Sequence, residues 1–425
     1  MLKRILFTSF GVLFLSLVLP ATEWPTSAQG GKPTRALFQL QEERSKLQDN
    51  FDRDVSDGKA QPYEWEMRAE SLKKIAEKRA AEFRITDWKR EEMVALITLY
   101  RQAEMHAQAV EASRVYLKTE PKSRFTSGIR SGLILSLLEL DQIEEAQKLM
   151  DELFLEMPEN QFELVSRVAL LKELTIAWRE LGRYDMVSKH ARRGYDLKIR
   201  NSRFPQLAQR TSDLMIRDRL IMAAEFISAA ERLGFKKDAD DSHKKVLATE
   251  FNEQEVLKSF YESELAAARL MANPAPEIDA PRWIGSEPIK MANLRGKVVL
   301  LDFWAMWCSQ CAGALPQWHE FQKKFSAKGF EIIGVTKLFG RSDTEEGLTR
   351  DQELNALRNF KVKNQLSYPL AVGKIDDLTN DERYAVAGLP TVVLIDRRGN
   401  VRHIKRGVGD YRKLEKQVNK LINEK

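Results

Sequence analysis

The chain has 425 residues, the length of about two or three average domains. Hydrophobic residues make up 43% of it and charged residues 31%, so it can build apolar cores and is not a disordered chain. Two cysteines and a net charge of +6 without a dense basic stripe exclude a disulfide-stapled fold, a four-cysteine metal site and a nucleic-acid-binding role.

Residues 1–28 have the composition of a secretory signal peptide. Two basic residues near the start precede an apolar run from Ile5 to Leu19, and small residues follow up to Ala28. We expect cleavage after Ala28 and a periplasmic or secreted protein. The alternative is an uncleaved membrane anchor, although the run of about 15 residues is shorter than the roughly 20 that span a bilayer.

Residues 34–271 are predicted to form an all-α domain. They contain six Gly and four Pro, whereas residues 272–425 contain twelve Gly and seven Pro. Apolar residues recur at intervals of three and four, which predicts amphipathic helices. The clearest such segments are 92–100, 129–140, 162–178 and 214–230.

Short polar breaks near residues 141, 183 and 235 separate helices of this domain from a following helix. Leu181-Gly182-Arg183-Tyr184 resembles the turn between the helices of a tetratricopeptide repeat. Because the breaks do not keep the 34-residue spacing of such repeats, an irregular helical bundle stays open as the alternative. With either architecture we expect a protein-binding domain. Three isolated histidines are expected at surface or cap positions, not as metal ligands: His106, His190 and His243.

Residues 272–276, which contain two prolines, are predicted to be a linker to a second domain at 277–425. Here the order of segments is βαβ, a crossover, a β-hairpin and a closing helix, which indicates an α/β domain. The predicted strands are 297–303, 331–336, 368–372, 391–396 and 401–405. Three helices are predicted: one from the cysteine pair to about residue 327, one over 351–364 and one over 411–422.

Cys308 and Cys311 stand two residues apart, shortly after an apolar strand and at the start of a predicted helix. The helix N–H groups and dipole would lower the pKa of Cys308, whose thiolate can attack a disulfide, while Cys311 resolves the mixed disulfide. One alternative is half of a zinc site, which needs two more ligands and has His319 as the nearest candidate. The other is a structural disulfide, whose loop is too short to stabilise much.

Three features make residues 276–425 resemble the thioredoxin superfamily, and within it the TlpA/ResA-like secreted thiol–disulfide oxidoreductases. They are the run from Leu294 to Cys311, Pro316 in the helix that follows, and Gly388-Leu389-Pro390-Thr391, which is similar to the cis-proline loop of the family. The resemblance implies a thioredoxin-like α/β fold.

The same resemblance implies roles for residues beside the cysteines. Pro390 is expected to be cis and to lie against them. The backbone of Leu389 is expected to pair with a substrate strand, and Trp307 to frame the exposed face of the site. The dithiol needs no metal and no organic cofactor.

Two departures from the family pattern stand out. Secreted relatives usually carry a glutamate where this chain has Ala314, and often an asparagine where it has Asp302. Because Asp302 ends the apolar strand, we expect it to be buried, to have a raised pKa and to exchange protons with the resolving thiol. The alternative is a capping or salt-bridged aspartate. The other departure is Ser309-Gln310, where many relatives have a proline before the second cysteine.

The sequence therefore predicts an exported thiol–disulfide oxidoreductase. Its expected partners are protein disulfide or dithiol substrates, a thiol electron donor or acceptor, and a protein bound by the helical domain. An alternative is an adaptor in which the helical domain acts and the thioredoxin-like domain is a binding module, although a pure binder has no need of the two thiols. A peroxidase of the related peroxiredoxin branch is a third hypothesis, and paired cysteines fit it less well.

Overall fold

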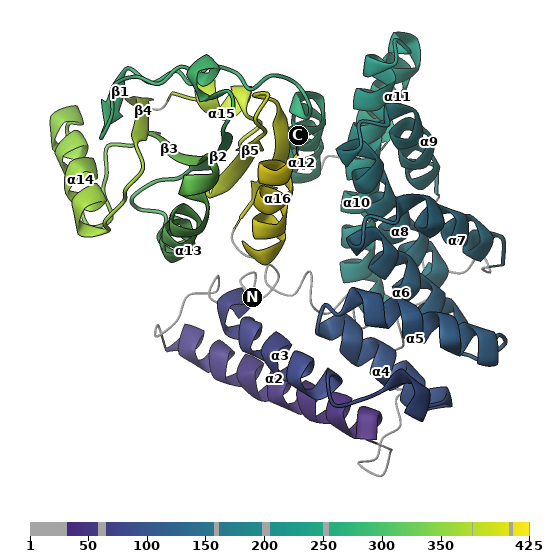
Figure 1. The fold of residues 1–425 in the computed structure, drawn as a ribbon. Helices are drawn as coiled ribbons and strands as arrows, with labels where there is room; N and C mark the ends of the chain where they lie inside the picture. Colours follow the sequence, from purple (N-terminus) through teal and green to yellow (C-terminus); the bar gives the residue numbers. More distant parts are fainter. Residues whose placement is uncertain are drawn as a thin grey trace. The chain divides into compact units, whose positions relative to one another are not determined.

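A computed structural model describes residues 32–57, 65–156, 161–197, 205–249, 255–375, 377–407 and 411–424. The chain divides into two compact units, residues 1–250 and 251–425 (Figure 1). The expected fold class is confirmed, because a helical unit is followed by an α/β unit with a six-stranded sheet. The predicted signal peptide, residues 1–28, lies outside the described residues. Within the part described, no helix is both long and apolar enough to cross a membrane.

The helical unit consists of antiparallel helices joined by short turns, and the four predicted amphipathic segments fall in α4, α6, α8 and α10. Its helices are α2 (Lys32–Ser56), α3 (Trp65–Ala80), α4 (Arg90–Gln102), α5 (His106–Thr119), α6 (Thr126–Glu139), α7 (Ile143–Glu156), α8 (Gln161–Glu180), α9 (Tyr184–Tyr195), α10 (Pro205–Arg232) and α11 (Lys236–Thr249).

Four helix pairs in this unit, α4–α5, α6–α7, α8–α9 and α10–α11, turn in the same way. Between the two helices stands a residue with positive φ: Glu104, Asp141, Gly182 or Gly234. The next amide donates to a carbonyl five residues earlier, as Arg183 N does to Trp178 O at 3.0 Å, which closes the first helix with a Schellman motif. The breaks predicted near 141, 183 and 235 are thereby confirmed as turns. The assignment to tetratricopeptide repeats stays a prediction.

The expectation that the histidines lie at surface or cap positions is wrong for His190. This side chain is fully buried on α9, next to the buried Val187 and Ala191, because it falls on the apolar face of that helix. Burial lowers the pKa of His190 to about 4, so the imidazole is uncharged at neutral pH. His106 and His243 are half-buried.

The α/β unit is built around one mixed sheet in the order β1-β4-β3-β2-β5-β6. β2, β3 and β4 are parallel, whereas β1, β5 and β6 each run antiparallel to their neighbours. Every residue of the central β2 is buried, as its unbroken apolar run predicts. The strands are β1 (Arg282–Ile284), β2 (Val298–Phe303), β3 (Phe330–Leu338), β4 (Leu370–Ile375), β5 (Thr391–Ile395) and β6 (Val401–Arg406).

Helices cover the two faces of this sheet unequally. On the first face pack α13 (Ser309–Phe325), α14 (Arg350–Lys363) and α16 (Tyr411–Asn423), against β2 residues such as Leu300. The second face, which includes Leu301, is covered by the end of α12 (Glu255–Leu270) and by the residues after α15 (Thr379–Arg383). Because side chains alternate along a strand, Asp302 points to the first face, toward α13. Except for β1, α12 and α15, these elements match the predicted segments.

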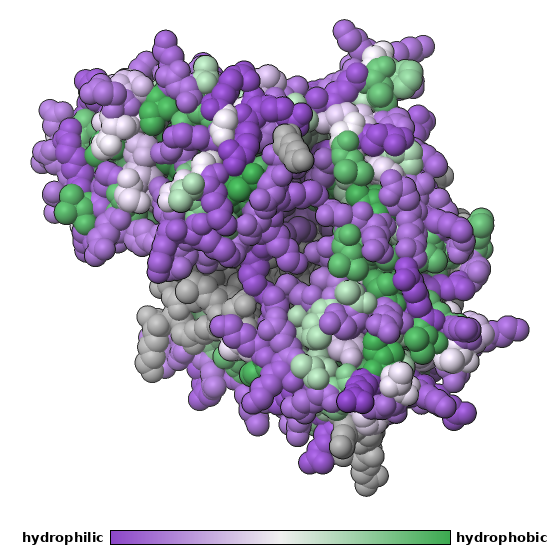
Figure 2. Space-filling view, in the orientation of Figure 1, coloured by the Kyte–Doolittle hydropathy of each residue, from purple (hydrophilic) through white to green (hydrophobic). Residues whose placement is uncertain are grey.

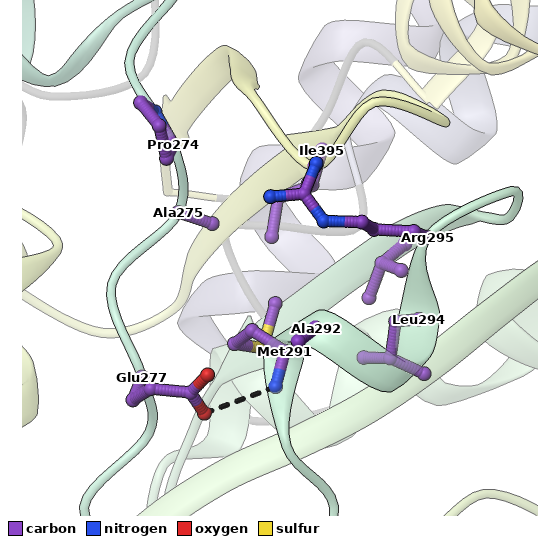
Figure 3. Close-up of a pocket in the computed structure, with 10 residues that line it drawn as sticks. Pro274, Ala275, Glu277, Met291, Ala292, Leu294, Arg295 and Ile395 are labelled. Carbon is purple, nitrogen blue, oxygen red and sulfur yellow. Dashed lines mark hydrogen bonds between the residues drawn. The ribbon is translucent and has the colours of Figure 1, made fainter.

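The predicted linker, residues 272–276, is hydrogen-bonded to the turn and strand of the β5–β6 hairpin. Val401 N donates to Asn273 O at 2.9 Å. Just beyond, the carboxylate of Glu277 accepts a hydrogen bond from Met291 N at 3.0 Å, at the edge of a small cavity of about 90 Å³ (Figure 3). This segment is therefore part of the edge of the α/β unit.

α12 also lies in the second compact unit, although the sequence analysis assigned it to the helical domain. Arg406 of β6 forms an ion pair with Glu264 of α12 and donates to the carbonyl oxygens of Ser263 and Ala385, at 3.0 and 3.2 Å. One arginine thus joins α12 to the sheet. The limits of the two independently folding domains, 34–271 and 277–425, stay a prediction.

We expect the α/β unit to need α12 for full stability. A fragment of residues 277–425 lacks Glu264 and also Leu270 and Met271, which pack on the second face. Its free energy of unfolding, measured with urea and circular dichroism, should be about 2–4 kcal/mol below that of residues 255–425. As a control, Glu264→Gln in the longer fragment should cost about 1 kcal/mol or less. Equal stability of the two fragments would support the boundary predicted from the sequence.

Candidate functional site

The two cysteines lie where β2 leads into α13. Cys308 is the N-cap of α13, and its sulfur accepts a hydrogen bond from Cys311 N at 3.1 Å. The two residues are joined in a disulfide with an S–S distance of 2.06 Å. Cys308 is 7% exposed and Cys311 only 1%. The first cysteine is therefore the more accessible of the two, as expected for an attacking thiol.

The pairing of β2 with β5 brings the proline loop to the same edge of the sheet. Phe303, the last residue of β2, pairs with Thr391, the first residue of β5. Because these strands are antiparallel, the residues after Phe303 and those before Thr391 are neighbours. The Leu389–Pro390 bond is cis, as expected, and Leu389 packs against the apolar cluster that contains both cysteines.

Asp302 is a buried carboxyl group, 1% exposed, on the face of the sheet that α13 covers. Burial raises its pKa to about 7, and the nearby indole N–H of Trp318 opposes that rise. Neither carboxyl oxygen completes a hydrogen bond or an ion pair with another described residue. The geometry of a capping or salt-bridged aspartate, which the sequence left open, is thus not found among these residues.

One face of α13 connects Asp302 with the resolving cysteine. Cys311, Ala314 and Trp318 are separated by three and four positions, so they lie on the same side of the helix, and all three are buried. Trp318 of this row approaches the carboxyl of Asp302. The position where relatives carry a glutamate, Ala314, therefore faces the same interface between β2 and α13.

Gly334 of β3 makes room for an indole beside Asp302. Gly334 of β3 and Asp302 of β2 are opposite each other in the β2–β3 pair. A Cβ atom at Gly334 would lie 2.9 Å from Trp304 Nε1 and 2.7 Å from a methyl carbon of Leu370, closer than real Cβ contacts. The absence of a side chain at Gly334 lets Trp304 fill the space there, opposite Asp302 in the strand pair.

The loop between β3 and α14 covers Trp307, a contact that the sequence did not predict. The rings of Trp307 and Phe339 meet edge to face with centroids 5.3 Å apart, and the Arg341 guanidinium lies 3.9 Å from the centre of the indole. The buried Glu353 of α14 holds the loop, since its carboxylate accepts hydrogen bonds from Phe339 N and Gly340 N at 2.9 and 2.8 Å. The sequence feature that could have indicated this loop was Glu353, a glutamate on the buried face of the helix predicted over 351–364.

A metal site is not apparent in the described part of the chain. No group of three or more His, Cys, Asp or Glu side chains there is arranged to hold an ion. Cys308 and Cys311 are bonded to each other, and His319 lies two turns along α13 from the second of them.

Comparisons with known proteins match the C-terminal part of the chain. The model of the AhpC/TSA family matches residues 271–404. Protein DipZ of Mycobacterium tuberculosis is 34% identical over 166 residues, which are 38% of this chain and 22% of DipZ. The thiol-disulfide oxidoreductase ResA of Bacillus thuringiensis subsp. konkukian is 29% identical over 147 residues, 34% of this chain and 76% of ResA. A solved thiol-disulfide isomerase from Corynebacterium glutamicum is 25% identical with a TM-score of 0.31, covering 36% of this chain and 98% of that one.

The family-model match and the similarity to ResA confirm the resemblance of the C-terminal part to ResA-like, thioredoxin-like domains. The chain spans only 22% of the length of DipZ, so the likeness concerns one part of that protein. The likeness of the helical unit to tetratricopeptide repeats is not among the matches described above and remains a prediction.

Asp302 should make the fold less stable at neutral than at acid pH. Its carboxyl ionises near pH 3.8 in the unfolded chain but near pH 7 in the folded one. Between these values the unfolded state loses a proton that the folded state keeps, so stability falls as pH rises through this window and is level above it. The difference of about three units corresponds to about 4 kcal/mol. Asp302→Asn should therefore raise the free energy of unfolding by up to about 4 kcal/mol at pH 8 and by little at pH 4.

The measurement is urea unfolding of the oxidised protein across this pH range. Asp396→Asn is the matched control, because Asp396 is also buried but accepts hydrogen bonds from Arg398 N, Asn400 N and the Arg402 side chain. It should destabilise the protein. An Asp302→Asn variant no more stable than the wild type at pH 8 would contradict the assignment of a buried, unpaired acid.

Proposed function

We propose that this protein is a thiol–disulfide oxidoreductase that works by dithiol–disulfide exchange at Cys308 and Cys311. The observation that carries the proposal is the position of the pair, at the first turn of α13 and at the edge where Leu389 and Pro390 meet it. The helix N-terminus stabilises a thiolate at Cys308. The similarity to ResA over this part of the chain supports the same chemistry.

In the reducing direction, the thiolate of Cys308 attacks one sulfur of a substrate disulfide. That S–S bond breaks, one substrate sulfur leaves as a thiolate that takes up a proton, and Cys308 stays bonded to the other sulfur. Cys311 then attacks the Cys308 sulfur, which releases the second substrate thiol and forms the Cys308–Cys311 disulfide. Two electrons pass to the substrate, and no metal or organic cofactor enters these steps. Oxidation of a dithiol follows the same steps in reverse.

Asp302 is the proposed acid–base group for Cys311. The resolving thiol must lose a proton before it attacks, and it is buried away from solvent. A carboxyl whose pKa is about 7 can take that proton and return it at neutral pH. Asp302 would thus exchange the proton with Cys311, a role that the side chain of Ala314 cannot fill because it has no acidic group.

Trp307, Leu389 and Pro390 are the proposed contacts for the substrate near its reacting sulfur. Leu389 offers backbone groups to an extended segment, and Pro390 lacks the N–H that would otherwise stand beside the sulfurs. Trp307 offers a half-buried aromatic surface.

We also propose that the protein is exported and that its partners are proteins. The composition of residues 1–28 supports a periplasmic or secreted protein, where disulfides persist. Its partners would be protein substrates, a thiol electron donor or acceptor, and a protein bound by the helical unit. Apolar side chains are exposed at the ends of successive helix pairs of that unit, and Figure 2 shows hydrophobic residues grouped on it. The exposed apolar side chains at the turns of these helix pairs are Leu140, Leu181, Leu233 and Phe235.

The order of attack by the two cysteines can be tested by trapping. Cys311→Ser should accumulate mixed disulfides between Cys308 and its partners, because the resolving thiol is missing, whereas Cys308→Ser should accumulate few. The measurement is non-reducing electrophoresis and mass spectrometry of the trapped species. If the protein were an adaptor, neither variant would trap partners and Cys308→Ser would keep full function. Faster alkylation of Cys311 than of Cys308 in the reduced protein at neutral pH would contradict the assignment.

The role of Asp302 can be tested by stopped-flow exchange across pH. Asp302→Asn should slow the resolving step by about 10- to 1,000-fold and leave the first attack nearly intact. In the wild type the resolving rate should rise with pH through about 7, as the carboxyl becomes able to accept a proton, and this rise should be absent from the variant. Adding Ala314→Glu should restore part of the rate, because the new carboxyl enters the same interface. Wild-type resolution by Asp302→Asn at every pH would leave Asp302 without a role in exchange.

A further inference from the structure

A groove begins beside the disulfide and runs over the carboxyl ends of β2 and β3 to α12. Its volume is about 650 Å³. Trp307 and Leu389, which flank the cysteines, line one part of it, and Ser263 and Ala266 of α12 line another. One open space thus extends from residues that flank the two cysteines to a helix that lies more than 30 residues before them in the sequence.

Part of the groove lining is apolar. Phe303 and Val335, two of the strand residues that line it, are buried in the second face of the sheet, and Thr336 and Lys337 of β3 line it as well. Leu378 also lines the groove and is 54% exposed. Such a surface gains free energy when an apolar side chain of a ligand covers it.

The charges that line the groove are mainly negative. Asp377, Asp381 and Glu382 contribute three carboxylates, and Lys337 contributes one ammonium group, which is bonded to Asp381 at 2.7 Å. Asp377 accepts hydrogen bonds from the Thr379 hydroxyl and amide at 2.6 and 3.0 Å, and these bonds keep its pKa below the ordinary value.

Two further cations, Lys374 and Arg341, lie close to these carboxylates or to the disulfide end of the groove. Lys374 lies close enough to Asp377 to favour its charged form, and Arg341 lies over Trp307 at the disulfide end. Arg406 is held by Glu264 outside the lining residues. Around the groove, Lys337 is paired with Asp381, Lys374 lies near Asp377, and Arg341 lies over Trp307 at the disulfide end, which leaves Glu382 and Asp377 as the carboxylates facing the groove.

We propose that this groove binds the polypeptide segment next to the substrate's cysteine, and that it selects a segment with an apolar side chain and a lysine or arginine. The inference rests on the exchange function proposed above. An apolar residue covers Leu378, the exposed apolar side chain of the groove, while a basic residue approaches Asp377 and Glu382. α12 then serves as the far wall of a substrate site and not merely as a connection between the units.

The test uses the reduced full-length protein and short peptides that hold one cysteine in a mixed disulfide with 2-mercaptoethanol. The peptides share a leucine near the cysteine and differ at one further position, which is Lys, Gln or Glu. At low ionic strength the Lys peptide should react about fivefold faster than the Glu peptide, and the difference should shrink in 1 M salt. Asp377→Asn/Glu382→Gln should bring the ratio close to one. The asparagine keeps the oxygen that accepts from Thr379.

The matched control is Asp351→Asn/Glu415→Gln, which changes the net charge equally on α14 and α16, the helices of the opposite face. It should leave the Lys-to-Glu ratio unchanged. A ratio of one in the wild type, or an equal loss of preference in the control, would overturn the inference.

Two further measurements separate this inference from the exchange function. If the protein reduces a small uncharged disulfide but shows no preference among the peptides, only the groove assignment fails. If it reduces no disulfide at all, the exchange function fails, and binding of peptides with serine in place of cysteine, measured by calorimetry, still decides the groove. Tighter binding of the serine-containing Lys peptide than of its Glu counterpart supports the groove, and equal binding refutes it.

Discussion

The antiparallel pairing of β2 with β5 is the contact on which the whole site depends. Phe303 and Thr391 are partners at its end, so the chain leaves β2 toward the cysteines at the point where Leu389 and Pro390 enter β5. Neither loop could bring a sulfur, a backbone edge and an aromatic surface together alone. The buried residues of β2 and β5 hold this register, because a slip by one residue would exchange the side chains that pack on the two covered faces of the sheet.

A second constraint follows from the same strand. An ionisable group in the row of apolar residues on β2 is costly in its charged form, and Asp302 has no ionic partner among the described residues to offset that cost. The fold therefore keeps the carboxyl protonated up to about neutral pH. Stability and chemistry are linked here, since the desolvation that destabilises the charged acid also sets a pKa at which a proton can be exchanged with Cys311.

The sequence was sufficient where information is local. The apolar run of β2, the paired cysteines, the proline loop and the breaks at Gly182 and Gly234 could all be read from neighbouring residues, and each lies in the structure where it was expected. What escaped prediction depends on distant contacts or short elements. Glu264 meets Arg406 142 residues later, α15 has only five residues, and Arg341 gains its place from a glutamate on another element. Periodicity carries no information on such pairs.

Residues that react and residues that line the groove come from different parts of the chain. The family model matches residues 271–404, which contain both cysteines, Asp302 and Pro390. α12 ends at Leu270, just before that match, yet Ser263 and Ala266 line the groove that opens beside the disulfide. If the groove selects substrates as proposed, the exchange chemistry belongs to the part that the family model matches, while one wall of the binding site comes from outside that match. Substitutions in α12 would then change which disulfides react and leave the thiol chemistry itself intact.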